Sequence, residues 1–589
     1  MQTFRRFPIG VAVILSASLL VYTCGGEGRG VQGGDADPGP TIASTNPEDL
    51  ATEVSPGAVV SAVFDRDIDP ATLNESTFRV RTSTGQTVPG AVTVTGDTAT
   101  FTPTDNLALR AAHVAALSAG IADLAGKVME SDHSWTFTTR DGTWGSPGPI
   151  APAGYRVGTC GVCEQWGVAS DPAGNVFAVW SGEDDSGRFG VWANRFSPGV
   201  GWDSPHSIGF DGSGGGILQV AASGSGNAMT VWTAGDNVWA NRYVAGAGWE
   251  GPALVRTVPA PPGGGSVLLN QAPLIAMNTG GSAVAVWSES TWSTIWDPAP
   301  LWTSVYDPGT GWGAAQMLDN SAITDYHVAG PVASVAMDDT GNAIVSWVRP
   351  DPGGDFYSSD IMVRRYTAGS GWEVSEVIDS GGVSTAPAIV ADSRGVCTLV
   401  WDRTDTPEQA SVRAARYLPG IGWGAPQPLW TFIGLITGFR VAAGAGGAVV
   451  VGWDRHLYDG ISNLTVSTTW TVRFDPDAGW DVPVCLDTTN QPGGDPSYAF
   501  PSVGVDPNGN AVAVWRHWDG SRFDAYAARY LAGSGWDISH PIEADDLTID
   551  GFPHVAVDSK GRATAVWPQA FEGTQSQFGP FEMRSSRFE

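Results

Sequence analysis

The sequence predicts an all-β protein in which an N-terminal β-sandwich is followed by an eight-bladed β-propeller of four-stranded blades. Three observations favour this fold class. The chain contains 77 glycines and 40 prolines, which suits many short strands joined by turns. Short strands of alternating pattern fill residues 39–140. From residue 141 to 589 a tryptophan-rich pattern repeats about every 55 residues, which is typical of a ring or array of similar units.

The charge of the chain excludes several classes of function. The sequence has 61 acidic against 31 basic residues and a formal net charge of −30. Nucleic-acid binding requires clustered basic residues, but Lys127 and Lys560 are the only lysines beside the arginines. Adhesion to an anionic membrane surface is excluded for the same reason, so contact with a membrane is expected only through a lipid anchor.

Residues 1–24 predict an export signal, with Arg5 and Arg6 preceding an apolar run that is too short to span a bilayer comfortably. Cys24 follows this run and precedes a glycine-rich stretch. The pattern resembles a bacterial lipoprotein signal, which implies that Cys24 is lipidated and that residues 25–38 form a flexible tether. The expected location is the bacterial cell envelope, at the outer membrane or cell surface. Ordinary signal cleavage and secretion is the alternative.

Cys160 and Cys163 are expected to close a small disulfide loop in an oxidising compartment. A thioredoxin-type redox pair is the alternative, but the sequence lacks the βαβ context of such chemistry. These two thiols have no second cysteine pair or histidine cluster beside them, so they do not indicate zinc. No metal and no cofactor are expected.

Residues 39–140 contain five short strand patterns, at 58–64, 78–81, 91–94, 98–101 and 134–137. The segment resembles the bacterial Ig-like domain of the SbsA type in its motifs Asn46-Pro47, Phe64 to Leu73, Phe101-Thr102-Pro103, Asp123 to Gly126 and Trp135 to Thr139. His113 stands where that family usually has a tyrosine. The resemblance implies a β-sandwich that acts as a spacer or adhesive module, without catalysis.

Two tryptophan motifs mark each repeat. One ends an apolar strand, at Trp180, Trp232, Trp287, Trp347, Trp401, Trp453, Trp515 and Trp567. The other follows a Gly-x-Gly turn or a close variant, at Trp144, Trp202, Trp249, Trp312, Trp372, Trp423, Trp480 and Trp536. The strand from Ala511 to Trp515 alternates small and large apolar residues, so both of its faces must be buried between neighbouring sheets. Four-stranded sheets packed face to face around an axis form a propeller.

The phase of the repeat predicts how the ring closes. Residues 144–150 form a fourth strand without its first three, and the chain ends at a third strand without its fourth. We therefore expect 144–150 to complete the last blade. The Gly-x-Gly-Trp turns resemble the Asp-box turns of sialidase-type propellers in turn and tryptophan only. An arginine precedes the aromatic residue that ends most third strands, and we expect it to stack on tryptophan.

Function is expected on the face that carries the long, variable connections between the second and third strands and between repeats. This face gathers aromatic and acidic residues that suit sugar rings, and the candidate ligand-binding residues are Trp292, Trp296, Asp351, Asp355, Tyr357, Asp405, Trp518 and Asp519. Acidic loops that merely keep a secreted protein soluble are the alternative. The opposite turns, such as Asp506 to Asn510, are short and stereotyped, and their aspartates are expected to cap tight hairpins.

The sequence favours a monomeric, non-catalytic binding protein that recognises a glycan or protein ligand at the cell surface. A carbohydrate-active hydrolase or lyase of the sialidase-like propeller type is the first alternative. However, no pair of carboxylates stands out and there is no catalytic motif for hydrolysis. A structural component of the cell envelope is the second alternative.

Overall fold

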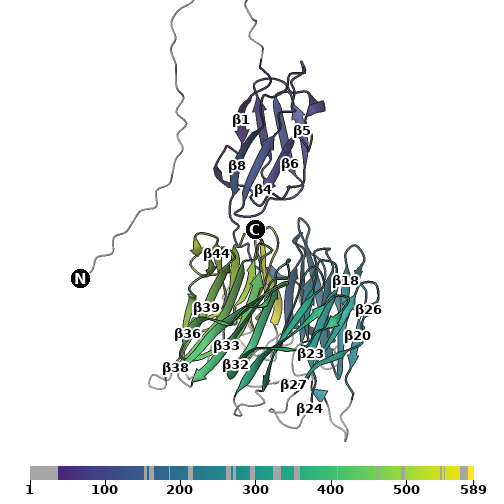
Figure 1. The fold of residues 1–589 in the computed structure, drawn as a ribbon, viewed down its shortest axis with the longest axis vertical. Helices are drawn as coiled ribbons and strands as arrows, with labels where there is room; N and C mark the ends of the chain where they lie inside the picture. The colour runs from purple at the N-terminus through teal and green to yellow at the C-terminus, as the bar shows by residue number, and fades with distance from the viewer. Residues whose placement is uncertain are drawn as a thin grey trace, which may run out of the picture.

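The computed structural model describes residues 38–151, 156–157, 165–184, 186–209, 217–259, 267–268, 273–291, 299–322, 333–350, 358–406, 409–459, 464–492, 498–543, 547–549, 551–570 and 581–589. Within these residues the regular structure is β-strand, apart from one 3₁₀ turn at Pro70–Thr72. A small sandwich lies at one end of a larger body of antiparallel sheets (Figure 1). The prediction of an all-β protein with an N-terminal sandwich is confirmed.

The sandwich consists of two four-stranded sheets. In sheet order, the first contains β1 (Ile42–Asn46), β3 (Val60–Phe64), β6 (Thr98–Pro103) and β5 (Gly90–Thr95). The second contains β2 (Ala51–Val54), β8 (His133–Thr139), β7 (Ala112–Leu117) and β4 (Phe78–Thr82). Phe78 packs on Phe101 and Trp135, with ring centroids 5.9 and 6.0 Å apart, and all three side chains are buried. Buried His113 stacks on Phe137, with ring centroids 5.4 Å apart, and so takes the position of an aromatic side chain in the core.

The remaining sheets share one pattern, in which the first, second and third strands pair antiparallel in chain order. The first strands are β11 (Trp166–Ser170), β16 (Leu218–Ala222), β22 (Leu274–Met277), β28 (Ala333–Met337), the second half of β32 (Glu376–Ala391), β37 (Leu435–Ala443), β42 (Ser502–Val505) and β47 (His554–Val557). The second strands are β12 (Val176–Glu183), β17 (Ala228–Ala234), β23 (Ala283–Ser288), β29 (Ala343–Pro350), β33 (Cys397–Thr406), β38 (Val449–Asp459), β43 (Ala511–Trp518) and β48 (Ala563–Ala570).

The third strands are β13 (Phe189–Ser197), β18 (Asn237–Val244), β25 (Ala299–Asp307), β30 (Ser359–Thr367), β34 (Gln409–Leu418), β39 (Leu464–Asp475), β44 (Phe523–Leu531) and β49 (Phe581–Phe588). Each Gly-Trp pair forms a two-residue strand against the third strand: β14 (Gly201–Trp202), β19 (Gly248–Trp249), β26 (Gly311–Trp312), β31 (Gly371–Trp372), β35 (Gly422–Trp423), β40 (Gly479–Trp480) and β45 (Gly535–Trp536). The fourth strands are β15 (His206–Gly209), β20 (Ala253–Thr257), β27 (Gln316–Ala322), the first half of β32, β36 (Gln427–Phe432), β41 (Val484–Pro492) and β46 (His540–Pro541).

The sheets are arranged in a closed ring. The first strands contact one another in chain order, and β47 of the last sheet contacts β11 of the first. β9 (Gly148–Pro149) pairs with β49, and the N–H of Ile150 donates to the carbonyl of Met583 at 3.0 Å. This segment before the first repeat thus lies beside the last third strand. Three short strands complete the structure: β10 (Arg156–Val157), which pairs with both β12 and β49, and β21 (Val267–Leu268), which pairs with β24 (Ser290–Thr291).

Arginines of the third strands link neighbouring sheets. Each guanidinium carbon lies 3.7 to 5.8 Å from the centre of the aromatic ring that ends the third strand of the next repeat. The pairs are Arg195 on Tyr243, Arg242 on Tyr306, Arg365 on Tyr417, Arg416 on Phe474, Arg473 on Tyr530, Arg529 on Phe588 and Arg587 on Phe196. The expected tryptophan partner was wrong, because each Gly-Trp ring already packs on the aromatic residue of its own repeat, as Trp480 does on Phe474 at 5.3 Å.

The tryptophans that end the second strands fill the spaces between sheets. Trp180, Trp232, Trp347, Trp401, Trp453, Trp515 and Trp567 are fully buried, and Trp287 is 2% exposed. Small residues on the adjoining sheets make room for them: a Cβ added to Gly209 would lie 2.3 Å from the ring of Trp232. Burial of both sheet faces, inferred from the alternation of small and large residues, is confirmed.

Candidate functional site

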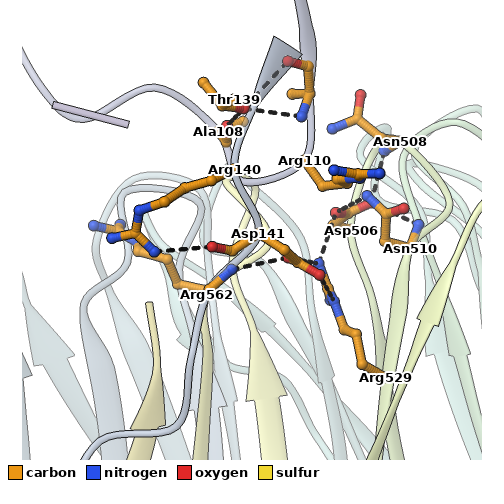
Figure 2. Close-up of polar contacts among 12 residues, drawn as sticks. Ala108, Arg110, Thr139, Arg140, Asp141, Asp506, Asn508, Asn510, Arg529 and Arg562 are labelled. Carbon is orange, nitrogen blue, oxygen red and sulfur yellow. Dashed lines mark hydrogen bonds and ion pairs between the residues drawn. The ribbon is translucent and has the colours of Figure 1, made fainter. Parts of the chain in front are cut away.

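The Ig-like sandwich contacts the face of the ring that carries the short turns. The N–H of Leu109 donates to the carbonyl of Lys560 at 2.7 Å, and Lys560 forms an ion pair with Asp105 at 3.4 Å. Leu109 is buried in the same apolar cluster as Phe588 of the last sheet. Figure 2 shows Asp141 between Arg140 and Arg529, with Arg529 Nη2 3.3 Å from its carboxylate.

The turns on this face are held by aspartates. Fully buried Asp506 accepts the N–H groups of Asn508 and Asn510 at 2.8 and 2.9 Å on one carboxylate oxygen, and the side-chain amide of Asn510 on the other. Gly509 takes the positive φ of 80° that the turn requires. Asp338 makes the same contacts in an earlier repeat. The expectation that these aspartates cap hairpins is confirmed.

The long connections lie at the opposite ends of the strands. Five predicted ligand-binding residues lie outside the described residues: Trp292, Trp296, Asp351, Asp355 and Tyr357. Asp405 belongs to β33 by its backbone. Cys24, Cys160 and Cys163 also lie outside the described residues. The predictions of ligand binding, lipidation and the disulfide therefore remain predictions.

Trp518 and Asp519 are described, and they occupy the tip of the hairpin between β43 and β44. Trp518 is partly exposed and contacts Phe523, with ring centroids 4.8 Å apart. Asp519 is exposed, and its Oδ1 accepts the N–H groups of Ser521 and Arg522 at 2.7 and 2.9 Å. The aspartate therefore shapes the turn that presents the tryptophan.

Aromatic residues from three neighbouring repeats adjoin this hairpin. Arg516 lies over the rings of Phe523 and Phe552, at 4.0 and 4.6 Å from their centres. Its Nε and Nη2 donate to the carbonyl of Tyr498 at 3.1 and 3.0 Å. Phe552 also packs edge-on against Phe500 at 4.3 Å. Arg516 therefore links the segment before β42, the start of β44 and the segment before β47 through its hydrogen bonds and ring contacts.

A strained residue in this cluster is held by a buried carboxylate. Phe500 has a φ of 41°, which is unfavourable for a residue with a bulky side chain. The N–H groups of Ala499 and Phe500 both donate to Asp454 Oδ2, and Thr469 donates to its Oδ1 at 3.2 Å. Asp454 is 1% exposed, and burial raises the pKa of its carboxyl to about 7 against the effect of these hydrogen bonds. The carboxylate fixes the turn that precedes β42.

A cavity of about 280 Å³ lies where the first strands converge. Its wall comes from β11, β16, β22, β28, β37, β47 and the Pro387–Ile389 part of β32. The lining residues lie mainly in the first half of each strand, and the first strands run from the long connections towards the short turns. The cavity is therefore displaced along the ring axis towards the face opposite the Ig-like domain.

One register position recurs in all eight first strands, and its residues line the wall in seven of them, Ser502 being the exception. Its members pair with the residue before the repeat tryptophan and are Gly167, Gln219, Leu274, Ser334, Ala388, Arg440, Ser502 and His554. Three of them accept an N–H from the next sheet: Gln219 from Ile275 at 3.3 Å, Ser334 from Ile389 at 3.1 Å, and Ser502 from Val555 at 3.1 Å. The position thus joins neighbouring sheets around the axis.

Arg440 and His554 are the ionisable residues among the described residues that line the cavity. Burial lowers the pKa of Arg440 to about 10, so its guanidinium stays charged at neutral pH. Burial and the charge of Arg440 lower the pKa of His554 to about 3, so this imidazole is neutral. Sequence reasoning missed both residues. Aligning the repeats on their tryptophans would have found them, because the same register position elsewhere is small, apolar or neutral.

The described cysteines are free thiols. Cys397 is buried, and burial raises the pKa of its thiol to about 12, whereas Cys485 is exposed. Among the described side chains, no three His, Cys, Asp or Glu residues gather into a group that could hold a metal ion. The part of the chain that the structure describes also contains no helix long and apolar enough to cross a membrane.

Comparison with protein families identifies the sandwich. Residues 36–139 match the family described as bacterial Ig-like domain, which agrees with the resemblance seen in the motifs and with the two sheets of the structure. A comparison of the whole chain with curated proteins found no match.

The chain is also similar to several solved structures at low identity. The BP39L lectin from Burkholderia pseudomallei is 14% identical with a TM-score of 0.40, over 64% of this chain and 99% of the lectin. The NanB sialidase from Streptococcus pneumoniae is 9% identical with a TM-score of 0.32, over 76% of this chain and 98% of the sialidase. The leech intramolecular trans-sialidase is 10% identical with a TM-score of 0.35, over 93% of each chain. At such identities and TM-scores, nothing about ligand or activity follows from these similarities.

Proposed function

We propose that this chain is an exported bacterial surface protein in which an Ig-like spacer carries an eight-bladed β-propeller that binds a glycan or protein ligand without catalysis. The arginine contacts between consecutive repeats support the closed ring, because they continue from Arg587 of the last third strand to Phe196 of the first. The pairing of β9 with β49 supports closure by the strand at 144–150. A bacterial Ig-like domain is in keeping with an extracellular or surface location.

The observation that carries the proposal is the position of the spacer. Leu109, Asp105 and Asp141 fix the Ig-like domain to the short-turn face of the ring. A tether attached to the N-terminal side of this domain would place the ring on the side of the domain that is farther from the envelope. The long-connection face then points away from the envelope, where a ligand can reach it. Trp518, held up by the Asp519 turn, offers an aromatic surface there for a sugar ring or an apolar side chain.

Ligand binding is tested by replacing Trp296, Tyr357 and Trp518 together with Ala. The mature chain and this variant are screened on a glycan array and with surface proteins as ligands, and each bound glycan is also assayed for hydrolysis. Loss of stacking should weaken binding by several kcal/mol with little change in folding. The matched control replaces the exposed apolar residues Val374, Val482 and Ile538, which lie near the short-turn ends of their strands. Unchanged binding in the triple variant would refute the site, and cleavage of a bound glycan would favour the hydrolase or lyase alternative.

The lipid anchor is tested separately. Mass spectrometry of the mature N-terminus should show an acylated Cys24. A mature chain that begins at another residue and carries no lipid would refute the anchor, while leaving the binding face open to the test above.

A further inference from the structure

A cleft distinct from the axial cavity lies between the Ig-like domain and the ring. Its volume is about 480 Å³, which falls within the usual range for ligand pockets, and boundaries between domains are a preferred place for such pockets. The domain contributes Ser83, Thr84 and residues 110–112 to one wall. The ring contributes the turns after β37 and β39 of one repeat and after β42 and β44 of the next. The cleft is therefore separate from the long-connection face.

Three side chains on these walls end in planar forks that have unpaired atoms. The guanidinium of Arg110 forms an ion pair with exposed Glu53 through Nη1, and its Nε and Nη2 have no hydrogen-bond partner among the described residues. The side-chain amide of Asn508 and the carboxylate of Asp477 also lack partners within the described part of the chain, where only the backbone N–H groups of these residues donate to aspartates. Figure 2 shows Arg110 beside the turn that contains Asn508. Donors and acceptors from both parts of the molecule thus remain available to a ligand.

Asp477 occupies a place that is glycine in the other turns of its kind. The turns that join a third strand to a Gly-Trp pair have, two residues before that pair, Gly199, Gly246, Gly309, Gly369, Gly420 and Gly533. The turn does not require a carboxylate at this place. The N–H of Gly309 donates to Asp307 Oδ1 at 2.8 Å, just as the N–H of Asp477 donates to Asp475 Oδ1 at 2.9 Å. The side chain of Asp477 is therefore available for a role other than shaping the turn.

The balance of charges in the cleft determines the class of ligand. Among its described lining residues, the cations are Arg110 and Arg473 and the anions are Asp475 and Asp477. Arg473 and Asp475 already pair with each other at 2.9 Å. A ligand with a net charge of either sign would lie beside a group of its own charge. A hydroxyl both donates and accepts, so a neutral polyol can satisfy the guanidinium, the amide and the carboxylate together.

We propose that the cleft between the Ig-like domain and the ring binds a neutral saccharide through its vicinal hydroxyl groups. Two neighbouring hydroxyls match each fork, because the paired atoms of a guanidinium, an amide or a carboxylate lie side by side in one plane. Arg110 holds the sugar from the domain, and Asp477 and Asn508 hold it from the ring. The site goes beyond the recognition proposed for the long-connection face and does not depend on it, because none of its residues belongs to that face.

Calorimetric titration of the mature chain tests the class of ligand. The probes are glucose, galactose, mannose, maltose, cellobiose and lactose, with glycylglycine and inorganic phosphate as charged comparisons. We expect at least one of the neutral sugars to bind. Its fully O-methylated derivative cannot donate hydrogen bonds and should bind about tenfold more weakly. Binding of none of the sugars, or tighter binding of glycylglycine or phosphate, would overturn the proposal.

Variants copied from other repeats locate the sugar in the cleft. Asp477→Gly introduces the glycine of the other turns, and Asn508→Ala introduces the residue found at Ala173 in the turn of the first repeat. Both should fold as the wild type does and should weaken sugar binding about tenfold, as should Arg110→Met from the domain side. Ala173→Asn is the matched control, because it creates the same turn sequence at a place that does not line the cleft. It should leave the sugar affinity unchanged.

The same variants separate this site from the long-connection face. Wild-type sugar affinity in Asp477→Gly, Asn508→Ala and Arg110→Met would overturn the proposal. If the affinity were instead lost in the variant that replaces Trp296, Tyr357 and Trp518, the sugar would bind at the long-connection face, and the proposed function would stand while the cleft site fails. Loss of affinity in the cleft variants, with wild-type affinity in that triple variant, would support the cleft site by itself.

Discussion

At the residue scale, Asp454 shows how one buried group can hold a strained turn. Its carboxyl accepts the two N–H groups at Ala499 and Phe500, which lie where the chain enters β42. Phe500 keeps its positive φ because those N–H groups would otherwise lack a buried partner. The ring of Phe500 then packs against Gly438, where an added Cβ would lie 2.2 Å from it. The strain is thus compensated by hydrogen bonds and by close packing.

The raised pKa of Asp454 predicts a specific pH dependence of stability. The folded protein holds a proton on Asp454 up to about pH 7, whereas the unfolded chain loses it near pH 4. The free energy of unfolding should therefore fall as the pH rises from 4 to 7, by about 2 to 4 kcal/mol from this group. Asp454→Asn should remove this slope in urea titrations at several pH values. The slope should persist in Asp519→Asn, and a wild-type slope in Asp454→Asn would show that another group causes it.

The histidines act in the opposite direction. Burial lowers the pKa of His456 to about 4, and its ring nitrogens lie 3.0 and 2.9 Å from the hydroxyls of Thr437 and Ser467. As the pH falls, His456 is protonated near pH 6.5 in the unfolded chain but only near pH 4 in the folded protein. This group therefore lowers the free energy of unfolding as the pH falls from about 6.5 to 4. The difference between Asp454→Asn and the wild type isolates the aspartate from this background.

At the scale of elements, the repeat tryptophans share a place but differ in their hydrogen bonds. The Nε1 of Trp515 donates to Asp487 on the fourth strand of the preceding sheet at 2.8 Å. Trp347 and Trp401 donate in the same way to Asp319 and Asp379. The Nε1 of Trp453, also fully buried, has no hydrogen-bond partner among the residues that the structure describes. The position therefore selects tryptophan for its volume, and the indole hydrogen bond is an addition in some repeats.

This difference gives a matched pair of variants. Trp515→Phe and Trp453→Phe each leave a similar cavity between sheets, but Trp515→Phe also removes a buried donor from Asp487. We expect Trp515→Phe to cost about 1 to 3 kcal/mol more in the free energy of unfolding. Urea denaturation of both variants measures this difference in the free energy of unfolding. Equal losses would show that the hydrogen bond to Asp487 contributes nothing net.

The arginine contacts between repeats predict a second pair of variants. Arg416→Met keeps most of the side-chain volume but removes the cation over Phe474, and should cost about 1 to 2 kcal/mol. Val305 occupies the place of the arginine in the third repeat, before Tyr306. Val305→Arg should place a guanidinium near Tyr366 of the next repeat and raise stability by up to about 1 kcal/mol. Thermal unfolding checks both, and a loss of stability in Val305→Arg would mean that Val305 is needed for packing.

At the scale of the whole molecule, the sandwich and the ring share a buried contact. Leu109 is 2% exposed, and it packs with Phe588 and partly buried Trp144, which close the last sheet. Backbone hydrogen bonds run in both directions between Thr143 and Glu589, at 3.1 and 3.2 Å. We expect the Ig-like domain and the ring to unfold together because separating them exposes this contact.

Leu109→Asp tests the coupling. A charge in the apolar junction should cost about 3 to 5 kcal/mol and separate the calorimetric transition into two, one for each part. Leu124→Asp is the control, since Leu124 lies in the same sandwich but is 68% exposed. If Leu109→Asp kept the same single transition as Leu124→Asp, the contact of Leu109 would not be what couples the two parts.

The sequence by itself determined the elements and their order. The recurrence of Trp347, Trp401 and Trp515 fixed the repeat, and the alternation of small and large residues showed that both sheet faces are buried. The motifs around Phe64, Phe101 and Trp135 identified the Ig-like domain. These features are local, because strand period, turn chemistry and burial pattern are properties of neighbouring residues.

The tertiary structure decided which residues meet across repeats. Arg440 and His554 are 114 positions apart in sequence numbering, and only the ring brings their register positions to one axial cavity. The arginine of each third strand found a tyrosine or phenylalanine of the next repeat rather than a tryptophan, because the tryptophan was already packed within its own repeat. The packing of Leu109 on the last sheet likewise determined which face of the ring the Ig-like domain covers. Such contacts depend on ring closure, which sums packing over the whole chain, so they emerge only when residues of different repeats are considered together.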